Sequence, residues 1–250
     1  MKKQHIDIWK EAQQNESAFW KSREKQGLAL SPVSFDRYRK CMKFFPLSIC
    51  HLTRILDVGS GPYGGVPFFI KKQCFKVSCD PLVGRKGEFL YKEVNKEVDS
   101  VQAIGEYLPF GAETFDFAFC VNALDHSYRP LYTLNELRRV LKRDKGVLIM
   151  MVHVVTSLEK IVHSIICKTR FRKVLSASSY VRFYVGSFFR LMLGFNVIDD
   201  SILHPFYFAP NDVVDLLNRA GFTISKMKLC PSPWNYKEEL FVIARKQFTG

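Results

Sequence analysis

The stretch from Arg54 to Gly65, RILDVGSGPYGG, constrains the fold of this chain most strongly. A short apolar run ends in the acidic residue Asp57, and glycines follow, which is the pattern of a buried strand, a tight turn and the start of a helix. Glycines in such a turn reach positive φ and carry no Cβ, so a ligand can lie against the backbone. Gly59, Gly61 and Gly64 also match the G-x-G-x-x-G dinucleotide pattern. The stretch therefore predicts either a ligand-binding turn or a plain strand–turn–helix unit.

Asp57 bears on which ligand this turn would bind. A dinucleotide places its pyrophosphate at such a turn, where a nearby carboxylate would repel it. S-adenosylmethionine brings an ammonium and a sulfonium group, which a carboxylate attracts. With its acid-x-Gly-x-Gly sequence, the chain resembles the class I S-adenosylmethionine-dependent methyltransferases from about Leu52 to His153, and more weakly from His204 to Gly221. A dehydrogenase that binds NAD is the alternative for this turn.

The resemblance implies an α/β fold, in which a Rossmann-like, seven-stranded, mostly parallel sheet has helices on both faces and one antiparallel strand. Amphipathic helices are predicted from about Pro130 and over 210–220, and a further helix is predicted after Gly65. Apolar runs and turn residues predict strands at 54–58, 75–80, 100–104, 115–121, 146–153, 222–229 and 240–244.

The 250 residues are interpreted as one methyltransferase domain in four parts. The apolar run from Tyr180 to Ile198 is interrupted by Arg182 and Arg190, which make a membrane span costly. A helical substrate cap is therefore the main interpretation of this region, and an in-plane membrane helix or simple core packing are the alternatives. The four parts are an N-terminal helical segment (1–50), a cofactor-binding core (51–156), a helical cap insertion (157–203) and the C-terminal part of the core (204–250).

Composition bears on the compartment and the partners of the chain. The formal net charge of +13 favours acidic partners, such as nucleic acid, anionic lipid heads or phosphorylated substrates, although scattered lysines also suit a solvated surface. The seven cysteines form no CxxC pair, and no spacing of His, Cys and acidic residues suggests a metal. No apolar run follows the basic N-terminus, as a signal peptide requires. We therefore expect a reducing, cytoplasmic compartment and no metal ion.

Nine residues are predicted to contact the cofactor. Asp80 ends the second predicted strand, 19 residues after Gly61, where an acid can accept both ribose hydroxyls. The resemblance assigns Glu106 and Tyr107 to the adenine side, where many family members read Asp-Ala-Glu-x-Leu-Pro-Phe. This chain has Ile104 where that Asp would fall, which keeps a non-catalytic nucleotide-binding module open as an alternative. The predicted set is Asp57, Gly59, Ser60, Gly61, Asp80, Pro81, Glu106, Tyr107 and Asn122.

Three histidines are predicted to lie at the carboxyl ends of the strands, where methyl donor and acceptor would meet. An oxygen or nitrogen acceptor has to lose a proton, which a positioned histidine can take. His126 is ranked first as this base, His204 second and His153 third, each against the alternative of a hydrogen-bonded structural histidine. The predicted function is methyl transfer to an oxygen or nitrogen atom of a small-molecule acceptor, sugar and lipid-linked acceptors included. The alternatives are an RNA methyltransferase and the non-catalytic module.

Overall fold

The computed structural model describes residues 2–25, 32–45, 48–61, 65–83, 98–154, 206, 208–231 and 238–247. The predicted cap and His204 lie outside these residues. In chain order the elements are α1 (Lys2–Lys25), α2 (Pro32–Phe44), β1 (Arg54–Val58), η2 (Val66–Phe69), β2 (Phe75–Asp80), β3 (Asp99–Gln102), β4 (Phe117–Val121), η3 (Leu124–His126), α4 (Pro130–Val140), β5 (Val147–Val154), α8 (Pro210–Arg219), β6 (Phe222–Pro231) and β7 (Glu238–Lys246).

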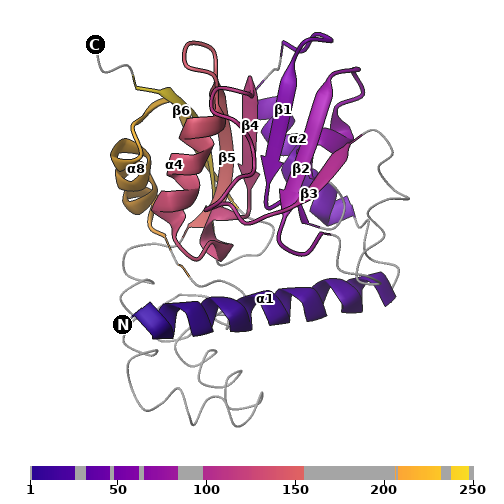
Figure 1. Cartoon of the computed structure of the whole chain (residues 1–250), viewed down its shortest axis with the longest axis vertical. Helices are drawn as coiled ribbons and strands as arrows, with labels where there is room; N and C mark the ends of the chain where they lie inside the picture. The colour runs from indigo at the N-terminus through magenta and orange to yellow at the C-terminus, as the bar shows by residue number, and fades with distance from the viewer. Residues whose placement is uncertain are drawn as a thin grey trace.

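The described strands form a seven-stranded sheet with the order β3-β2-β1-β4-β5-β7-β6 (Figure 1). The five strands from β3 to β5 run parallel, and β7 runs antiparallel to both β5 and β6. The central parallel strands are apolar along nearly their whole length because both of their faces are covered. The predicted mostly parallel sheet with one antiparallel strand is confirmed.

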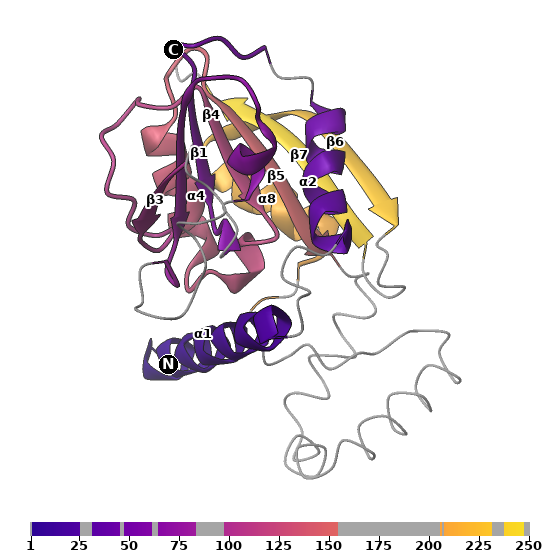
Figure 2. The ribbon, with the colours of Figure 1, turned by 90° about the vertical axis from the view of Figure 1, so that its right-hand side faces the viewer.

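The sheet is covered by helices on both faces (Figure 2). On one face, Leu134 and Leu137 of α4 and Leu217 of α8 pack into a core cluster with side chains of the strands. On the other face, Cys41 of α2 and Val66 of η2 belong to a second cluster. Burying two such layers removes enough apolar surface from water to fix the positions of the strand ends.

The strand order changes direction at β1, which lies between β2 on one side and β4 on the other. At such a switch point the chain leaves neighbouring strands toward opposite faces, and a crevice opens outside their carboxyl ends. The helix α1 runs beneath these carboxyl ends in Figure 1. The fold therefore places a potential ligand site between the ends of β1, β2 and β4 and the helix α1.

Element boundaries differ from the sequence prediction mainly near the glycine turn. The predicted helix after Gly65 is the short 3-10 helix η2, and Ile70 is already extended after it (φ −91°, ψ 98°). The strand predicted at 100–104 is β3, which begins at Asp99 and ends at Gln102. Among the described residues, no helix combines the length and apolar character that a membrane crossing requires.

Candidate cofactor and active site

The glycine turn adopts the backbone conformation that its sequence predicts. Gly59 and Gly61 have φ values of +70° and +62°, a region that side chains with a Cβ rarely enter. A Cβ added at Gly59 would overlap the Cβ of Ala123, which follows β4. The N–H of Gly59 donates to the carbonyl of Cys79 at 2.8 Å. Glycine therefore allows the ends of β1, β2 and β4 to meet closely.

Asp57 lies inside the protein beneath the turn, with 1% of its surface exposed. Its Oδ2 accepts a hydrogen bond from the N–H of Val66 at 2.7 Å, whereas its Oδ1 is buried without a hydrogen-bond partner among the described residues. Burial raises the pKa of Asp57 to about 8, although the bond from Val66 opposes this shift. Asp57 therefore binds the backbone of the turn from below, at the cost of an unfavourably buried carboxyl group. It is not among the residues that line the cavity.

Asp80, at the end of β2, is held by backbone donors on both sides. Its Oδ2 accepts from the N–H of Gly61 and its Oδ1 accepts from the N–H of Leu82, each at 2.9 Å. Burial raises the pKa of Asp80 to about 6. Each carboxylate oxygen keeps a further lone pair, so the side chain can accept two hydroxyl groups from a ligand.

A cavity lies at the carboxyl ends of β1, β2 and β4, with an empty volume of about 540 Å³ that is partly open to solvent. It is lined by residues from the strand ends, from the loops after β3 and β4, and from α1. They are Trp9, Gln13, Glu16, Val58, Gly59, Asp80, Pro81, Leu82, Ile104, Gly105, Glu106, Cys120, Asn122, Ala123, His126, Ser127 and Thr133.

The structure brings part of the predicted site together at this cavity. The predicted residues on its wall are Gly59, Asp80, Pro81, Glu106, Asn122 and His126. Ser60 is buried, Gly61 lies beneath Trp20, and Tyr107 is 69% exposed outside the cavity wall. Their contacts with the cofactor stay predictions, as do those of the wall residues.

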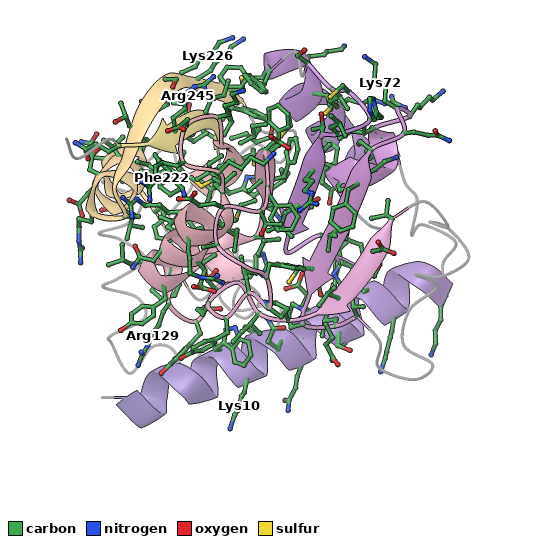
Figure 3. The ribbon with its side chains drawn as sticks, turned by 45° about the horizontal axis from the view of Figure 1, so that its top comes forward. Lys10, Lys72, Arg129, Phe222, Lys226 and Arg245 are labelled. Atoms are coloured by element: carbon green, nitrogen blue, oxygen red, sulfur yellow. The ribbon has the colours of Figure 1, made fainter. Side chains whose placement is uncertain are left out.

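The sequence interpretation left open whether the N-terminal helical segment covers the cofactor or packs against the core, and it named no site residue on α1. Trp9, Gln13 and Glu16 line the cavity, and their spacing of four and three residues places them on one face of a helix. That spacing was a detectable signal, but it did not reveal which part of the core the face would contact. Figure 3 shows the neighbouring Lys10 pointing away from the sheet, on the outer side of α1.

Glu16 connects α1 to both the cavity and the glycine turn. Its Oε2 lies 2.8 Å from Nδ1 of His126, and its Oε1 accepts a hydrogen bond from Nε1 of Trp20 at 3.3 Å. A Cβ added at Gly61 would lie 3.5 Å from the Trp20 ring. Trp9 packs against Tyr128 with ring centroids 6.3 Å apart. These contacts close α1 over the site and place a carboxylate next to His126.

Asn122 is strained and has an available acceptor. It is a non-glycine residue with φ +55°, and its N–H donates to the carbonyl of Met151 at 2.7 Å. Its Oδ1 is buried on the cavity wall without a hydrogen-bond partner among the described residues. Strained residues with unsatisfied polar atoms cluster at ligand sites, where a ligand supplies the missing partner. Asn122 therefore offers an acceptor to an N–H or O–H donor in the cavity.

Glu106 fixes the loop on the opposite side of the cavity. It is 4% exposed, and its Oε1 accepts from the N–H of Arg129, the residue just before α4, at 2.8 Å. This bond ties the loop after β3 to the start of α4. Among the described residues, no group of three or more His, Cys, Asp or Glu side chains could hold a metal ion.

Comparisons with known proteins agree with this geometry. Residues 56–150 match the family model described as "Methyltransferase domain". Similar solved structures include the 1,6-didemethyltoxoflavin-N1-methyltransferase of Burkholderia thailandensis with bound S-adenosylhomocysteine (15% identity, 95% of this chain, 88% of that chain, TM-score 0.60). A methyltransferase in a complex with the Trm112 methyltransferase activator of Haloferax volcanii has 12% identity, 94% and 98% coverage and a TM-score of 0.61.

A third similar structure is a S-adenosylmethionine-dependent methyltransferase from Aquifex aeolicus, with 16% identity, 85% coverage of this chain, 93% of that chain and a TM-score of 0.52. At such identities these structures show the fold. No curated protein matches the sequence significantly. Residues 56–150 therefore match a methyltransferase domain, and the chain has the fold of S-adenosylmethionine-dependent methyltransferases.

The cavity suits the chemistry of S-adenosylmethionine, the cofactor that the sequence predicts. The ammonium and ribose hydroxyl groups of the cofactor are hydrogen-bond donors, and Asn122 and Asp80 place acceptors on the cavity wall. The carboxyl group of Asp57 lies below the turn and adds negative potential when it is ionised, above its raised pKa of about 8. These acceptors match a cationic cofactor better than a pyrophosphate.

Proposed function

We propose that this enzyme methylates an oxygen or nitrogen atom of a small-molecule acceptor. When bound, S-adenosylmethionine supplies a methyl group on a sulfonium, and a neutral thioether is the leaving group. The observation that carries the proposal is the position of α1, whose residues Trp9, Gln13 and Glu16 form one wall of the cavity. A site closed by a helix in this way suits an acceptor small enough to enter beside the cofactor.

The described residues would contribute mainly by binding and alignment. Asp80 accepts the ribose hydroxyls, Asn122 accepts a donor next to β4, and the glycine turn lets the cofactor lie against the backbone. Holding two reactants in line can lower a barrier by about 7–11 kcal/mol in favourable cases. His126 stays a predicted base, and its neighbour Glu16 would favour the protonated imidazole.

We also propose the cap, the second base and the location that the sequence predicts. Residues 157–203 would form a cap over the acceptor, and His204 would lie beside it as the second predicted base. Sugar and lipid-linked acceptors both remain candidates, with peripheral membrane contact in the lipid-linked case. The described cysteines form no disulfide, in keeping with the cytoplasmic location that we propose.

The test is methyl transfer from labelled S-adenosylmethionine by the purified protein into cell extract, which is then separated into lipid, RNA and small-molecule fractions. We expect label in the small-molecule or lipid fraction, and a large loss of label with the variant Asp80→Asn. The matched control is Asp215→Asn, an exposed acid on α8. Label confined to RNA, or no label in any fraction, would contradict the proposal.

A second candidate is RNA methylation, and one surface favours it. The guanidinium of Arg129 lies 5.1 Å from the ring centroid of Tyr128 and 5.0 Å from that of Tyr132, on the outside of the molecule near α1 (Figure 3). Tyr107 and Tyr132 are 69% and 48% exposed. Exposed rings beside an arginine suit unpaired bases and phosphates.

The salt dependence of RNA binding separates this candidate from the first. If RNA is the substrate, affinity for single-stranded RNA falls steeply with salt, and Arg129→Gln reduces the slope of log affinity against log salt by about 1. Lys72→Gln is the control, because Lys72 lies at the far end of the molecule from α1 in Figure 3. Weak binding with an unchanged slope in Arg129→Gln would remove the candidate.

A further inference from the structure

Two cysteines lie at the amino ends of β1 and β2, at the edge of the sheet opposite the cavity. Cys50 precedes β1 and is exposed, and Cys74 precedes β2 and is half-buried. The ammonium of Lys72 donates to the carbonyl of Ile49 at 3.2 Å, which ties the segment before β1 to the loop before β2. Figure 3 shows Lys72 at the end of the molecule that lies far from α1. The two cysteines are therefore separate from the candidate cofactor site.

A tight turn places the Cys50 thiol against the side chain of Thr53. The N–H of Thr53 donates to the carbonyl of Cys50 at 3.1 Å, and the N–H of Cys50 donates to Oγ1 of Thr53 at 2.9 Å. The Sγ of Cys50 lies 3.5 Å from the same Oγ1. Cys50 is thus fixed beside the residue that immediately precedes β1.

Cys74 lies beside Thr53 on the neighbouring strand. Arg54 and Phe75 are partners in the parallel register, and the N–H of Phe75 donates to the carbonyl of Thr53 at 3.1 Å. Extending this register by one residue pairs Thr53 with Cys74, on strands about 4.8 Å apart. The Arg54 guanidinium lies 5.8 Å from the Phe75 ring centroid, so these two side chains share one face. Because side chains alternate along a strand, Thr53 and Cys74 share the opposite face.

The two thiols are thus neighbours of one side chain, and their electrostatics agree with this placement. Burial raises the pKa of Cys74, the ammonium of Lys76 opposes this shift, and the charge of an ionised Cys50 raises the pKa further. Charges near the surface affect each other in this way only at short range, because water and salt screen them. A disulfide joins Cα atoms about 4.4–6.8 Å apart, which is the scale of the spacing between adjacent strands.

The environments of the two thiols suit the two steps of a thiol oxidation. Hydrogen bonds from the Thr53 hydroxyl and from the N–H of Leu52 lower the pKa of the exposed Cys50. An exposed thiolate attacks peroxides, and redox-sensing cysteines combine these properties with a second cysteine nearby. Buried cysteines of the core lack them, as burial raises the pKa of Cys79 to about 12. Cys50 therefore suits the first step, and Cys74 suits the second.

We propose that Cys50 and Cys74 are a peroxide-reactive pair that closes into a reversible disulfide across the amino ends of β1 and β2. The Cys50 thiolate attacks one oxygen of hydrogen peroxide, the O–O bond breaks, and the departing hydroxide takes up a proton to form water. Cys50 becomes a sulfenic acid. The Cys74 thiol attacks this sulfur, the S–O bond breaks, and the hydroxyl group leaves as water with the thiol proton. The two thiols lose two electrons, the peroxide gains them, and a dithiol reverses the bond.

The disulfide has two consequences for the protein. It closes the loop from Cys50 to Cys74, which contains β1, the glycine turn and η2, and such a bond constrains the unfolded chain more than the folded one. The oxidised protein should therefore be more stable than the reduced protein. The bond also holds Cys50 in a state that a dithiol can reduce, whereas further oxidation of a sulfenic acid is irreversible.

The test treats the purified protein with a small excess of hydrogen peroxide, blocks the remaining thiols with N-ethylmaleimide and maps the tryptic peptides by mass. Trypsin releases Cys50 in the peptide 44–54 and Cys74 in the peptide 73–76, each with a single cysteine. We expect these two peptides to be joined in the monomer and separated by dithiothreitol. Two copies of 44–54 joined in a dimer, or no linked peptide at all, would overturn the inference.

Three variants separate the roles of the thiols. Cys74→Ser should still form a sulfenic acid at Cys50, which dimedone labels, but no linked peptide, and Cys50→Ser should form neither. Cys230→Ser is the matched control, because Cys230 is a half-buried cysteine on β6, and it should give the same linked peptide as wild type. A disulfide from Cys50 to any cysteine other than Cys74, or equal dimedone labelling of Cys50→Ser and Cys74→Ser, would contradict the assignment.

Thermal unfolding gives a second readout, which needs neither peptide mapping nor an acceptor. The Tm of oxidised wild type should exceed that of the reduced protein by about 5 °C or more, and dithiothreitol should reverse the rise. Cys74→Ser should show the same Tm before and after peroxide treatment. An oxidised wild type that is no more stable than the reduced protein would show that the fold does not accommodate the bond. That result would leave the proposed methyl transfer untouched.

Discussion

At the residue scale, Asp57 shows how a site residue can oppose the stability of the fold. Its carboxyl group is buried, and burial raises its pKa from 3.8 to about 8. The folded state therefore keeps a proton that the unfolded chain releases above pH 4. The favourable contribution of the protonated form is fully present below about pH 4 and is lost as the pH rises toward 8.

The variant Asp57→Asn should remove this pH dependence, because the amide oxygen can still accept from Val66 but carries no charge. We expect the free energy of unfolding of the cofactor-free variant to exceed that of wild type by roughly 1–3 kcal/mol at pH 8, with little difference at pH 4. Urea unfolding at pH 4, 6 and 8 measures it. Equal stability of the two proteins at pH 8 would show that Asp57 is not desolvated in this way.

Asp80 predicts a pH dependence of cofactor affinity. Burial raises its pKa to about 6, and its ionised form is the better acceptor for ribose hydroxyls. Below pH 6 a proton has to leave before the cofactor binds, so affinity should fall by up to about tenfold per pH unit and level off above pH 7. Calorimetry with S-adenosylhomocysteine from pH 5 to 8 measures this.

The variant Asp80→Asn tests whether Asp80 causes the fall in cofactor affinity below pH 6. The variant should weaken cofactor binding at pH 8 by about 10–100-fold, because charge-assisted hydrogen bonds contribute roughly 1.5–3 kcal/mol. Its cofactor affinity should no longer fall below pH 6. If cofactor affinity still falls below pH 6 in this variant, another group causes the pH dependence. Asp116→Asn, on the loop before β4, serves as the control acid.

The parts of the site that depend on the local backbone conformation could be predicted from the sequence. The positive φ of Gly59 and Gly61 follows from their place after an apolar strand, and the acid at the end of β2 follows from its spacing. The direction of the Asp57 side chain could not be predicted, because it is set by the N–H of Val66, nine residues further along the chain.

At the scale of elements, helix α1 was predictable as a helix but its position was not. Helical spacing groups Trp9, Gln13 and Glu16 on one face, yet their partners are more than a hundred residues away, at His126 and Tyr128. Such long-range contacts leave no periodic signal in a single sequence. The strands, in contrast, show apolar runs of their own, and their predicted positions agree with the structure to within a few residues.

The contacts of α1 predict that it opens more easily than the sheet unfolds. Replacing Glu16 by Ala removes the partner of His126 and of the Trp20 indole. We expect trypsin to cleave after Lys21 about 3–10 times faster, while the free energy of global unfolding changes by less than about 1 kcal/mol. Limited proteolysis and urea unfolding measure these two quantities.

Gln14→Ala is the matched control, because Gln14 is exposed on the outer side of the same helix. Trypsin should cleave this variant at the wild-type rate. If trypsin also cleaves Glu16→Ala at the wild-type rate, the contacts of Glu16 do not hold α1 against the core. Saturating S-adenosylhomocysteine should slow cleavage of wild type if the cofactor is enclosed beneath α1.

At the scale of the whole molecule, the strand order and the glycine turn indicate a methyltransferase fold. They do not indicate which acceptor is methylated. Many acceptors are compatible with one cofactor fold, because the sheet fixes the nucleoside site and other segments shape the acceptor site. The net charge of +13 distinguishes poorly between RNA and a soluble surface. The predicted cap over 157–203 lies outside the described residues, so its place in the fold stays a prediction.

The switch point between β1 and β4 predicts how cofactor binding affects the stability of the entire fold. A ligand there joins the loops after β1, β2 and β4, so unfolding of the core releases it. S-adenosylhomocysteine at 100 times its dissociation constant should stabilise the protein by about 2.7 kcal/mol, which corresponds to a rise of about 5–10 °C in Tm for a domain of this size. Above pH 8, where the Asp57 carboxyl group beneath the turn is ionised, NAD at equal concentration should leave Tm unchanged, because its pyrophosphate would be repelled by this charge. Thermal unfolding with each ligand is the measurement, and a shift with NAD as large as that with S-adenosylhomocysteine would mean that the charge of this turn does not select the cofactor.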